Sequence, residues 1–292
     1  MTDGSVGTGR GIAFPGQVDD RGPIDALLAE HAAHPLVKRL GEVLGTDDVH
    51  AADFADTRVA QPLTYTAGLL SAWHRPGSAP VAAMGHSLGE ITALAYAGAL
   101  APEEGLALVR ELGEIGERQW SARPSSLTAV MGLDAEGVEW ARRTALASRG
   151  GFLDVSGYNG PQQTVLSGDA STARAAAAAA EALGATVQVL PIRGAYHSPL
   201  LGPHLPRWRA AVRALEWRDP RIPVVSSVDA RTRTDRADLP ELLTRWLVLP
   251  VRWADTMAEA RRRGVEALVD AGPGRVLRRL GRRIGPPPFT DA

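Results

Sequence analysis

The 292-residue chain contains no cysteine. Disulfide bonds, thiol catalysis and thiolate metal sites are therefore excluded, and nothing in the sequence requires an oxidising compartment. No run reaches the ~18 apolar residues that a membrane-spanning helix needs, and the start of the chain, MTDGSVGTGRG, has no apolar signal segment. We therefore expect a cytoplasmic protein that does not bind a membrane.

Excess charge of either sign is also lacking. The 32 lysines and arginines nearly balance 33 aspartates and glutamates, which leaves a formal net charge of −1, and Lys38 is the only lysine. This balance gives no global electrostatic attraction for nucleic acid or for an anionic membrane surface. We expect a monomer that binds no nucleic acid.

The hydrophobic patterns divide the chain into two outer parts and a middle part. Strand-like and helix-like segments occur in both outer parts: strands at 11–14, 222–228 and 265–270, helices at 24–28, 36–44, 63–73, 204–215 and 253–263, and a frayed tail from Gly285. In the middle part the order is β-α-β-β-α-β, with strands at 126–133, 153–158, 163–167 and 186–192 and helices at 136–148 and 171–183. This is the order of a ferredoxin-like split unit.

The chain is longer than a usual single domain. We therefore predict an α/β fold with a large α/β-hydrolase-like domain that contains a parallel sheet, formed by residues 1–125 and 195–292. A ferredoxin-like small subdomain over residues 126–194 is inserted into it.

The segment Gly85-His86-Ser87-Leu88-Gly89 follows a short apolar run and precedes a helix-like stretch. It matches the G-x-S-x-G nucleophile elbow, in which a strained strand-to-helix turn exposes the serine hydroxyl. The amides at the start of the following helix would stabilise an oxyanion at the same place. An ordinary glycine-rich turn gives the same pattern, so the nucleophile assignment of Ser87 depends on a partner base.

A serine hydroxyl needs such a base, and near pH 7 it is usually a histidine. We place His31 and His34 on a polar helix and His50 and His74 near loops, and we expect His86 to point away from Ser87 on a tight turn. His197 follows the last strand of the middle unit, where the chain returns to the main sheet. It is the candidate base; the alternative is a loop histidine that bonds only to backbone.

Seven motifs, in order over residues 12 to 283, together resemble those of the malonyl-CoA:acyl-carrier-protein transacylase family, which includes the acyltransferases of polyketide synthases. They are Ala13–Gln17, Gln61–Leu63, Gly85–Glu90, Asn159–Gly168, Tyr196–Leu201, Pro250–Trp253 and Gly272–Leu277.

The resemblance implies a two-step transfer in polyketide-type biosynthesis, with no bound cofactor or metal. Ser87 takes an acyl group from an acyl-CoA or carrier-protein thioester and passes it to the phosphopantetheine thiol of an acyl carrier protein, while His197 acts as base and then as acid. The implied oxyanion hole is formed by the backbone amides of Gln17 and Leu88, and the carbonyl of Trp246 orients the histidine. The implied acyl pocket comprises Leu112, Gly116, Tyr196, Gln61, Asn159 and Gln163.

The chain departs from the resembled pattern in the helix after the elbow. Relatives that use malonyl substrates carry there an arginine, followed by glycine, that clamps the free carboxylate, and this chain has Leu112. Arg110 lies about 200° around a helix from that position, so it cannot replace the clamp. An unpaired buried carboxylate costs on the order of several kcal/mol. We therefore predict a non-carboxylated acyl group.

Two smaller departures accompany this one. Gly116 stands where the family commonly has methionine, which either enlarges the pocket or relieves helix packing. Val18-Asp19-Asp20 follows Gln17 in place of the usual glycine, which affects the shape of the oxyanion loop.

Three alternatives remain open from the sequence. The first is an acyl-carrier-protein hydrolase with the same serine and histidine, the second a malonyl transacylase with a relocated cation, and the third an inactive scaffold that binds carrier proteins. Carrier-protein docking has three candidate surfaces, each rich in arginine: Arg207–Arg209 with Arg213, Arg261–Arg263, and Arg278–Arg279 with Arg282–Arg283.

Overall fold

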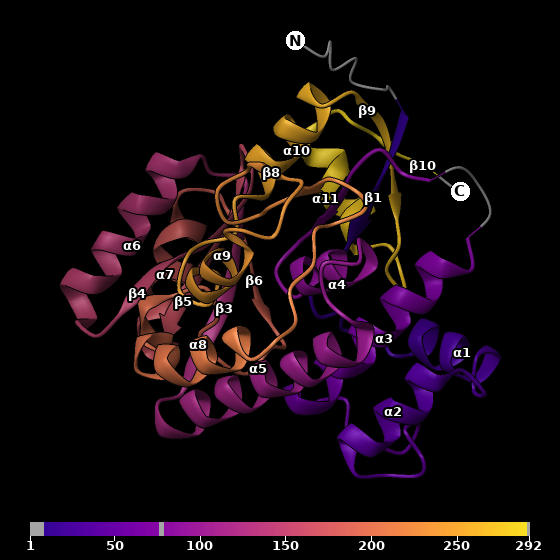
Figure 1. The fold of residues 1–292 in the computed structure, drawn as a ribbon. Coiled ribbons are helices and arrows are strands. Elements are labelled where there is room, and N and C mark those ends of the chain that lie inside the picture. The colour runs from indigo at the N-terminus through magenta and orange to yellow at the C-terminus, as the bar shows by residue number, and fades with distance from the viewer. Residues whose placement is uncertain (1–8, 76–78, 291–292) are drawn as a thin grey trace.

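The computed structural model describes residues 9–75 and 79–290 (Figure 1). Residues 1–8, on which much of the signal-segment prediction depends, lie outside this range. In chain order the elements are β1 (Gly9–Phe14), α1 (Gly22–Glu30), α2 (Pro35–Leu44), α3 (Thr57–Trp73), β2 (Ala83–Gly85), α4 (Gly89–Tyr96), α5 (Pro102–Ala122), β3 (Ser125–Met131), α6 (Ala135–Arg149), β4 (Leu153–Gly160), β5 (Gln163–Asp169), α7 (Ala170–Ala182), β6 (Thr186–Leu190), the 3-10 helix η1 (Pro199–His204), α8 (Leu205–Arg213), β7 (Val224–Val225), β8 (Thr232–Arg233), α9 (Leu239–Trp246), α10 (Trp253–Arg262), β9 (Val265–Asp270), α11 (Val276–Ile284) and β10 (Phe289–Thr290).

The larger sheet has the strand order β10-β9-β1-β2-β7-β8, and its neighbouring strands are parallel except for the antiparallel pair β7 and β8. Alternate residues of β1 face opposite sides of this sheet. Ile12 and Phe14 pack into the core that contains α3, α4 and α5, whereas Ala13 packs into a second core with α10 and α11. Helices therefore cover both faces, as is usual for a parallel sheet, and the α/β prediction is confirmed.

The smaller sheet is antiparallel, with the strand order β4-β5-β3-β6 (Figure 1). Its elements follow the predicted order β-α-β-β-α-β, which is that of a ferredoxin-like unit. Helices α6 and α7 cover one face, where Val130 and Leu166 pack against them. The other face carries Leu127, Ala129 and Val165, which pack into the same core as Ile12 and Phe14 of the larger sheet. The boundaries at residues 126 and 194 stay a prediction.

The C-terminal segment differs from its prediction. The tail expected to fray from Gly285 instead contains β10, which pairs in parallel with Leu268 and Val269 of β9. Its Phe289 ring packs so tightly on α11 that a Cβ atom on Gly281 would lie 2.5 Å from it. An aromatic side chain beyond the three prolines thus anchors the segment to the sheet.

Other predictions need smaller corrections. The strand expected at 222–228 is reduced to Val224–Val225, because the following residues bend to contact Glu90 through Ser227. His31 and His34 do not share a helix: His31 ends α1 and His34 caps the start of α2. Within the described residues, no helix combines the length and apolar character needed to cross a membrane.

Candidate active site

Ser87 lies in the turn between β2 and α4 with a φ of 53°. Such a left-handed conformation is strained for a residue with a side chain, and it is the conformation of a nucleophile elbow. The flanking glycines make the turn possible. A Cβ atom on Gly85 would lie 1.9 Å from the Gly89 carbonyl carbon, and one on Gly89 would lie 2.0 Å from the Phe14 carbonyl oxygen.

His197 is the partner of this serine, at a distance of 2.7 Å between its Nε2 and the Oγ of Ser87. The other ring nitrogen, Nδ1, lies 3.1 Å from the Trp246 carbonyl oxygen and 3.2 Å from that of Leu249. Two carbonyl acceptors require a proton on Nδ1, which leaves the lone pair of Nε2 directed at the serine hydroxyl. The edge of the ring also meets the Trp246 indole, with centroids 4.7 Å apart.

Burial sets the protonation state of this histidine. His197 is 5% exposed, and its burial lowers its pKa to about 4, although the hydrogen bonds to the Trp246 and Leu249 carbonyls act in the opposite direction. At neutral pH the imidazole is therefore uncharged, which is the state that a general base needs. The groups that orient it are backbone carbonyls and not a carboxylate.

Two backbone amides lie beside the serine. The N–H of Leu88 belongs to the start of α4, and Gln17 follows β1 in a loop so close that a Cβ atom on Gly16 would lie 3.3 Å from the Ser87 Cβ. Within residues 9–75 and 79–290, neither amide donates to another backbone carbonyl outside a helix or strand. Both are suited to stabilise negative charge at this point.

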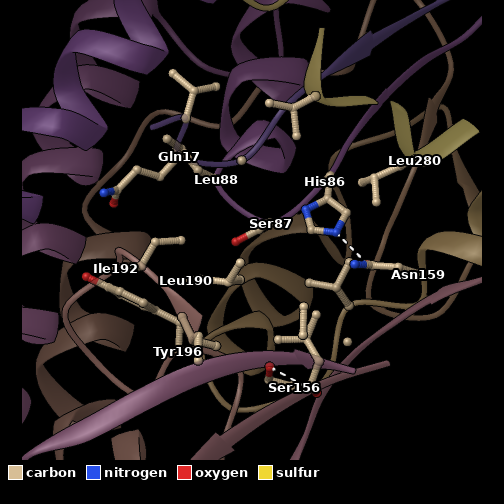
Figure 2. Close-up of a pocket in the computed structure, with 18 of the residues that line it drawn as sticks. Gln17, His86, Ser87, Leu88, Ser156, Asn159, Leu190, Ile192, Tyr196 and Leu280 are labelled. Atoms are coloured by element: carbon tan, nitrogen blue, oxygen red, sulfur yellow. Dashed lines mark hydrogen bonds between the residues drawn. The ribbon is translucent and has the colours of Figure 1, made fainter. Parts of the chain in front are cut away.

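A cavity of about 480 Å³ opens at Ser87, between the elbow and the open face of the smaller sheet (Figure 2). Its apolar wall comes mainly from β3, β5 and β6, through Leu127, Ala129, Met131, Val165 and Leu190. On another side the Nε2 of His86 lies 2.7 Å from the Oδ1 of Asn159, which joins the elbow to β4. The burial of His86 lowers its pKa, so this ring is also neutral.

Most of the predicted site residues come together around this cavity. The lining includes Gln17, Gln61, Ser87, Leu88, Asn159, Gln163, Tyr196 and His197. Trp246 lies behind His197 and is buried.

Leu112 and Gly116, in contrast, are separated from the cavity by Tyr196. The Tyr196 hydroxyl donates to the Leu112 carbonyl oxygen over 3.4 Å, and a Cβ atom on Gly116 would lie 1.8 Å from that hydroxyl. The space that Gly116 leaves is therefore filled by the tyrosine ring. The pocket is not enlarged at this position, and the close contact of Gly116 is with Tyr196 rather than with another helix.

Several residues were not expected from the sequence to line the cavity. They include His86, the apolar residues of the smaller sheet, and Val276, Arg279, Leu280 and Arg282 of α11. The alternation of Leu127, Ala129 and Met131 in the sequence does predict that they share one face of a strand. It does not reveal that this face covers Ser87, because the two sheets are brought together only in the folded chain.

The three arginine-rich surfaces differ in their surroundings. Arg207 pairs with Glu111, and Arg262 and Arg263 both pair with Glu259. On α11, Arg279 and Arg282 are exposed, line the cavity, and form no salt bridge within the described residues. Of the three surfaces, the one on α11 therefore adjoins the cavity at Ser87.

The arginine nearest in sequence to Leu112 does not reach the cavity. Arg110 donates to the Arg58 carbonyl over 3.1 Å and to Glu114 over 2.8 Å. As for metals, the part of the chain that the structure describes holds no group of three or more histidine, aspartate or glutamate side chains suited to a metal ion.

Comparison with known proteins gives consistent results. The acyl transferase domain family matches residues 39–284. The chain is 30% identical to the malonyl CoA-acyl carrier protein transacylase of Bacillus subtilis, over 94% of this chain and 88% of the relative. It is 34% identical to the polyketide biosynthesis protein ThaF of Burkholderia thailandensis, over 94% of this chain and 24% of that longer protein.

Among solved structures, the fold is similar to that of PlMCAT:AntF, a type II polyketide synthase acyl-carrier protein in complex with its malonyl-transacylase. The TM-score is 0.84 and the identity 28%, over 97% of this chain and 94% of the other. Since the family match covers most of the chain and includes the elbow and the histidine that meets it, this protein belongs to the acyl transferase domain family.

Proposed function

We propose that this protein transfers a non-carboxylated acyl group from a thioester to the phosphopantetheine thiol of an acyl carrier protein, through an acyl-enzyme on Ser87. The observation that carries the proposal is the 2.7 Å contact between Ser87 Oγ and the neutral His197 Nε2 at the elbow. The relatives support the class of reaction and the partner, since one is named as an acyl carrier protein transacylase and another was solved with a carrier protein bound. ThaF supports a place in polyketide-type biosynthesis.

In the first half-reaction, Ser87 Oγ attacks the thioester carbonyl carbon while His197 Nε2 takes the hydroxyl proton. The carbonyl oxygen becomes an oxyanion that accepts hydrogen bonds from the amides of Leu88 and Gln17. When the tetrahedral intermediate collapses, the carbon–sulfur bond breaks and the thiolate takes the proton from His197. The products are a free thiol and the Ser87 ester.

The second half-reaction is the same sequence in reverse. The carrier-protein thiol loses its proton to His197 Nε2 and attacks the Ser87 ester, and the serine leaves with that proton. The Trp246 and Leu249 carbonyls hold the Nδ1 proton in place throughout and stabilise the imidazolium. If water replaces the thiol, the same residues perform hydrolysis.

The selection against a carboxylated acyl group rests on the charges around the cavity. Leu112 is 1% exposed within the apolar core, and Arg110 is engaged elsewhere. The arginines among the described lining residues, Arg279 and Arg282, both belong to α11. In Figure 2 their neighbour Leu280 lies on the His86 side of Ser87, opposite Gln17 and Tyr196. We assign them to the phosphate of the pantetheine arm and to the acidic carrier protein.

Intact-mass measurement after incubation with acetyl, longer neutral acyl and malonyl thioesters tests this function. A neutral acyl adduct on Ser87 that is discharged by a carrier-protein thiol supports the proposal, and the Ser87→Ala protein should take up no acyl group. Release mainly as free acid would identify a hydrolase instead. No adduct from any thioester would favour a scaffold, and preferential malonyl loading would favour a relocated carboxylate clamp.

A further inference from the structure

Neutral amide and hydroxyl groups gather at one end of the cavity. Figure 2 shows the amide of Gln17 and the hydroxyl of Tyr196 on the same side of Ser87, away from His86 and Asn159. Gln61, which is 3% exposed, also lines the cavity, and its side chain lies near the Tyr196 hydroxyl. The carbonyl oxygens of Gln17 and Gln61 are both buried without a hydrogen-bond partner.

Buried amide oxygens of this kind normally have partners, since leaving them unpaired is unfavourable. Of the three glutamine oxygens of the lining that are buried without a partner, those of Gln17 and Gln61 belong to the Tyr196 end of the cavity, and a group absent from the protein itself would complete their hydrogen bonding. A glutamine amide offers both a donor and an acceptor, and its last torsion angle turns easily. Such a pair therefore suits an uncharged polar group in either orientation.

A charged group suits this end of the cavity less well. Burial raises the pKa of Tyr196 far above its ordinary value, so its phenol remains neutral, and its proton is directed at the Leu112 carbonyl. Asp19 is the one carboxylate among the described lining residues. It lies two positions after Gln17 in the sequence and would repel an anion. A plain hydrocarbon would leave both amide oxygens unpaired.

From this we infer that the acyl group itself carries an uncharged hydrogen-bonding function, such as an amide, hydroxyl or ketone, a short distance beyond the thioester carbonyl, and that Gln17 and Gln61 bind it. This inference rests on the acyl transfer proposed above and specifies its substrate class. It makes Gln61 a specificity-determining residue.

The test compares three thioesters whose acyl groups have the same number of non-hydrogen atoms. Malonamyl ends in a neutral amide, malonyl in an anionic carboxylate, and isovaleryl in a hydrocarbon. The effects of charge and of polarity on the rate can therefore be told apart. The quantity to measure is kcat/KM for acylation of Ser87. We expect malonamyl to exceed each of the other two by about tenfold or more, because only malonamyl both matches the amides and remains uncharged.

The variant Gln61→Leu should lower kcat/KM for malonamyl by about tenfold while isovaleryl is unchanged or improved. Gln163→Leu is the matched control. Gln163 is also a buried glutamine of the lining whose side-chain oxygen has no partner. Its backbone, however, pairs with that of Gly160 in β4, next to Asn159, which lies on the His86 side of Ser87. It should change all three substrates by the same factor. If thermal unfolding shows that Gln61→Leu is not folded, Gln61→Met keeps the side-chain length and serves in its place.

Equal rates for malonamyl and isovaleryl in the unmodified protein would overturn the inference, as would a uniform loss in Gln61→Leu. In both cases acylation of Ser87 would still support the proposed transfer. If malonyl were the best substrate, the inference and the proposed acyl selectivity would both be wrong. If no thioester acylated Ser87, the proposed function itself would fail.

Discussion

At the residue scale, the site depends on two side chains held in unusual backbone conformations. Ser87 and His197 both have positive φ values, 53° and 57°, and the two are among three non-glycine residues with this property in the described chain. Such conformations persist only where the surroundings fix them. Here β2 and α4 fix the serine, while backbone hydrogen bonds around Trp246 and Leu249 fix the histidine.

The pH dependence of acylation should report the buried state of His197. Its pKa is lowered from 6.5 to about 4, so the base stays unprotonated. We expect kcat/KM for Ser87 acylation to be flat from about pH 7 to about pH 5 and to fall only toward pH 4. Stopped-flow or rapid-quench acylation across this range measures it. A midpoint near the ordinary histidine pKa would show that the ring is more hydrated than the structure indicates.

The same shift affects stability, which supplies the control for that experiment. Because the unfolded chain binds a proton at His197 near pH 6.5 and the folded chain does so only near pH 4, this residue lowers the free energy of unfolding as the pH falls through that window. Circular dichroism at each pH should therefore accompany the kinetics. Only rates from fully folded protein enter the profile.

Gly116→Ala tests the contact that fills the space behind the pocket. The added Cβ atom would lie 1.8 Å from the Tyr196 hydroxyl, so the tyrosine must move, and His197 is the next residue. We expect acylation of Ser87 to slow by about tenfold or more, as misplacement of a catalytic group does. Gly202→Ala is the control, since its Cβ would meet no atom within 4 Å. An unchanged rate in Gly116→Ala would mean that Tyr196 does not help to place the histidine.

At the element scale, α11 and β10 form one unit at the edge of the larger sheet. Phe289 of β10 packs against Gly281, and Arg278 donates to the Thr290 carbonyl over 2.7 Å. Because α11 carries Arg279 and Leu280 to the cavity, the short edge strand holds part of the cavity lining in position. The segment that contains β10 thus helps to place one side of the cavity.

Phe289→Ala should therefore weaken substrate binding more than chemistry. Loss of the ring removes packing worth about 2 kcal/mol for a half-buried aromatic side chain, which urea unfolding can measure. We also expect KM for the acyl thioester to rise several-fold while kcat changes little, because Ser87 and His197 lie on other elements. A fall in kcat with an unchanged KM would contradict this division of roles.

At the scale of the whole molecule, the cavity exists because one face of the smaller sheet packs over the elbow of the larger one (Figure 2). The His86–Asn159 hydrogen bond ties the two together at 2.7 Å. Arg279 and Arg282 stand beside this opening, so the surface proposed above to meet the carrier protein is basic although the net charge of the chain is −1. Local placement of charge, rather than the total charge, is the basis of the proposed docking surface.

Charge reversal of both arginines tests that surface. Arg279→Glu with Arg282→Glu should lower kcat/KM for the carrier-protein substrate by about tenfold to a hundredfold at low salt, with a smaller effect at high salt. Acylation of Ser87 by a small thioester without phosphate should be unaffected. Arg213→Glu on α8, outside the cavity lining, is the control. Equal losses in the double variant and the control would place docking elsewhere.

The features of the site that depend on neighbouring residues were readable from the sequence. Glycine is required at position 85 because the Gly89 backbone lies against it, and at position 89 because the Phe14 carbonyl does. Both requirements are visible in the sequence as the G-x-S-x-G pattern. The order of strands and helices in the middle unit was likewise predictable, since it follows from hydrophobic periodicity within short segments. The contact between Ser87 and His197, 110 positions apart, was expected on two grounds: His197 follows the last strand of the middle unit, and the motifs resemble those of a known family.

Tertiary structure alone decided which side chains meet at the cavity. Tyr196 fills the space over Gly116, α11 brings Arg279 to the opening, and the face of β3 with Leu127 and Ala129 covers the elbow. None of these contacts joins residues close in sequence, so no periodicity or spacing encodes them. They arise when two sheets bury their apolar faces against shared helices, and the size and polarity of the cavity at Ser87 follow from that packing.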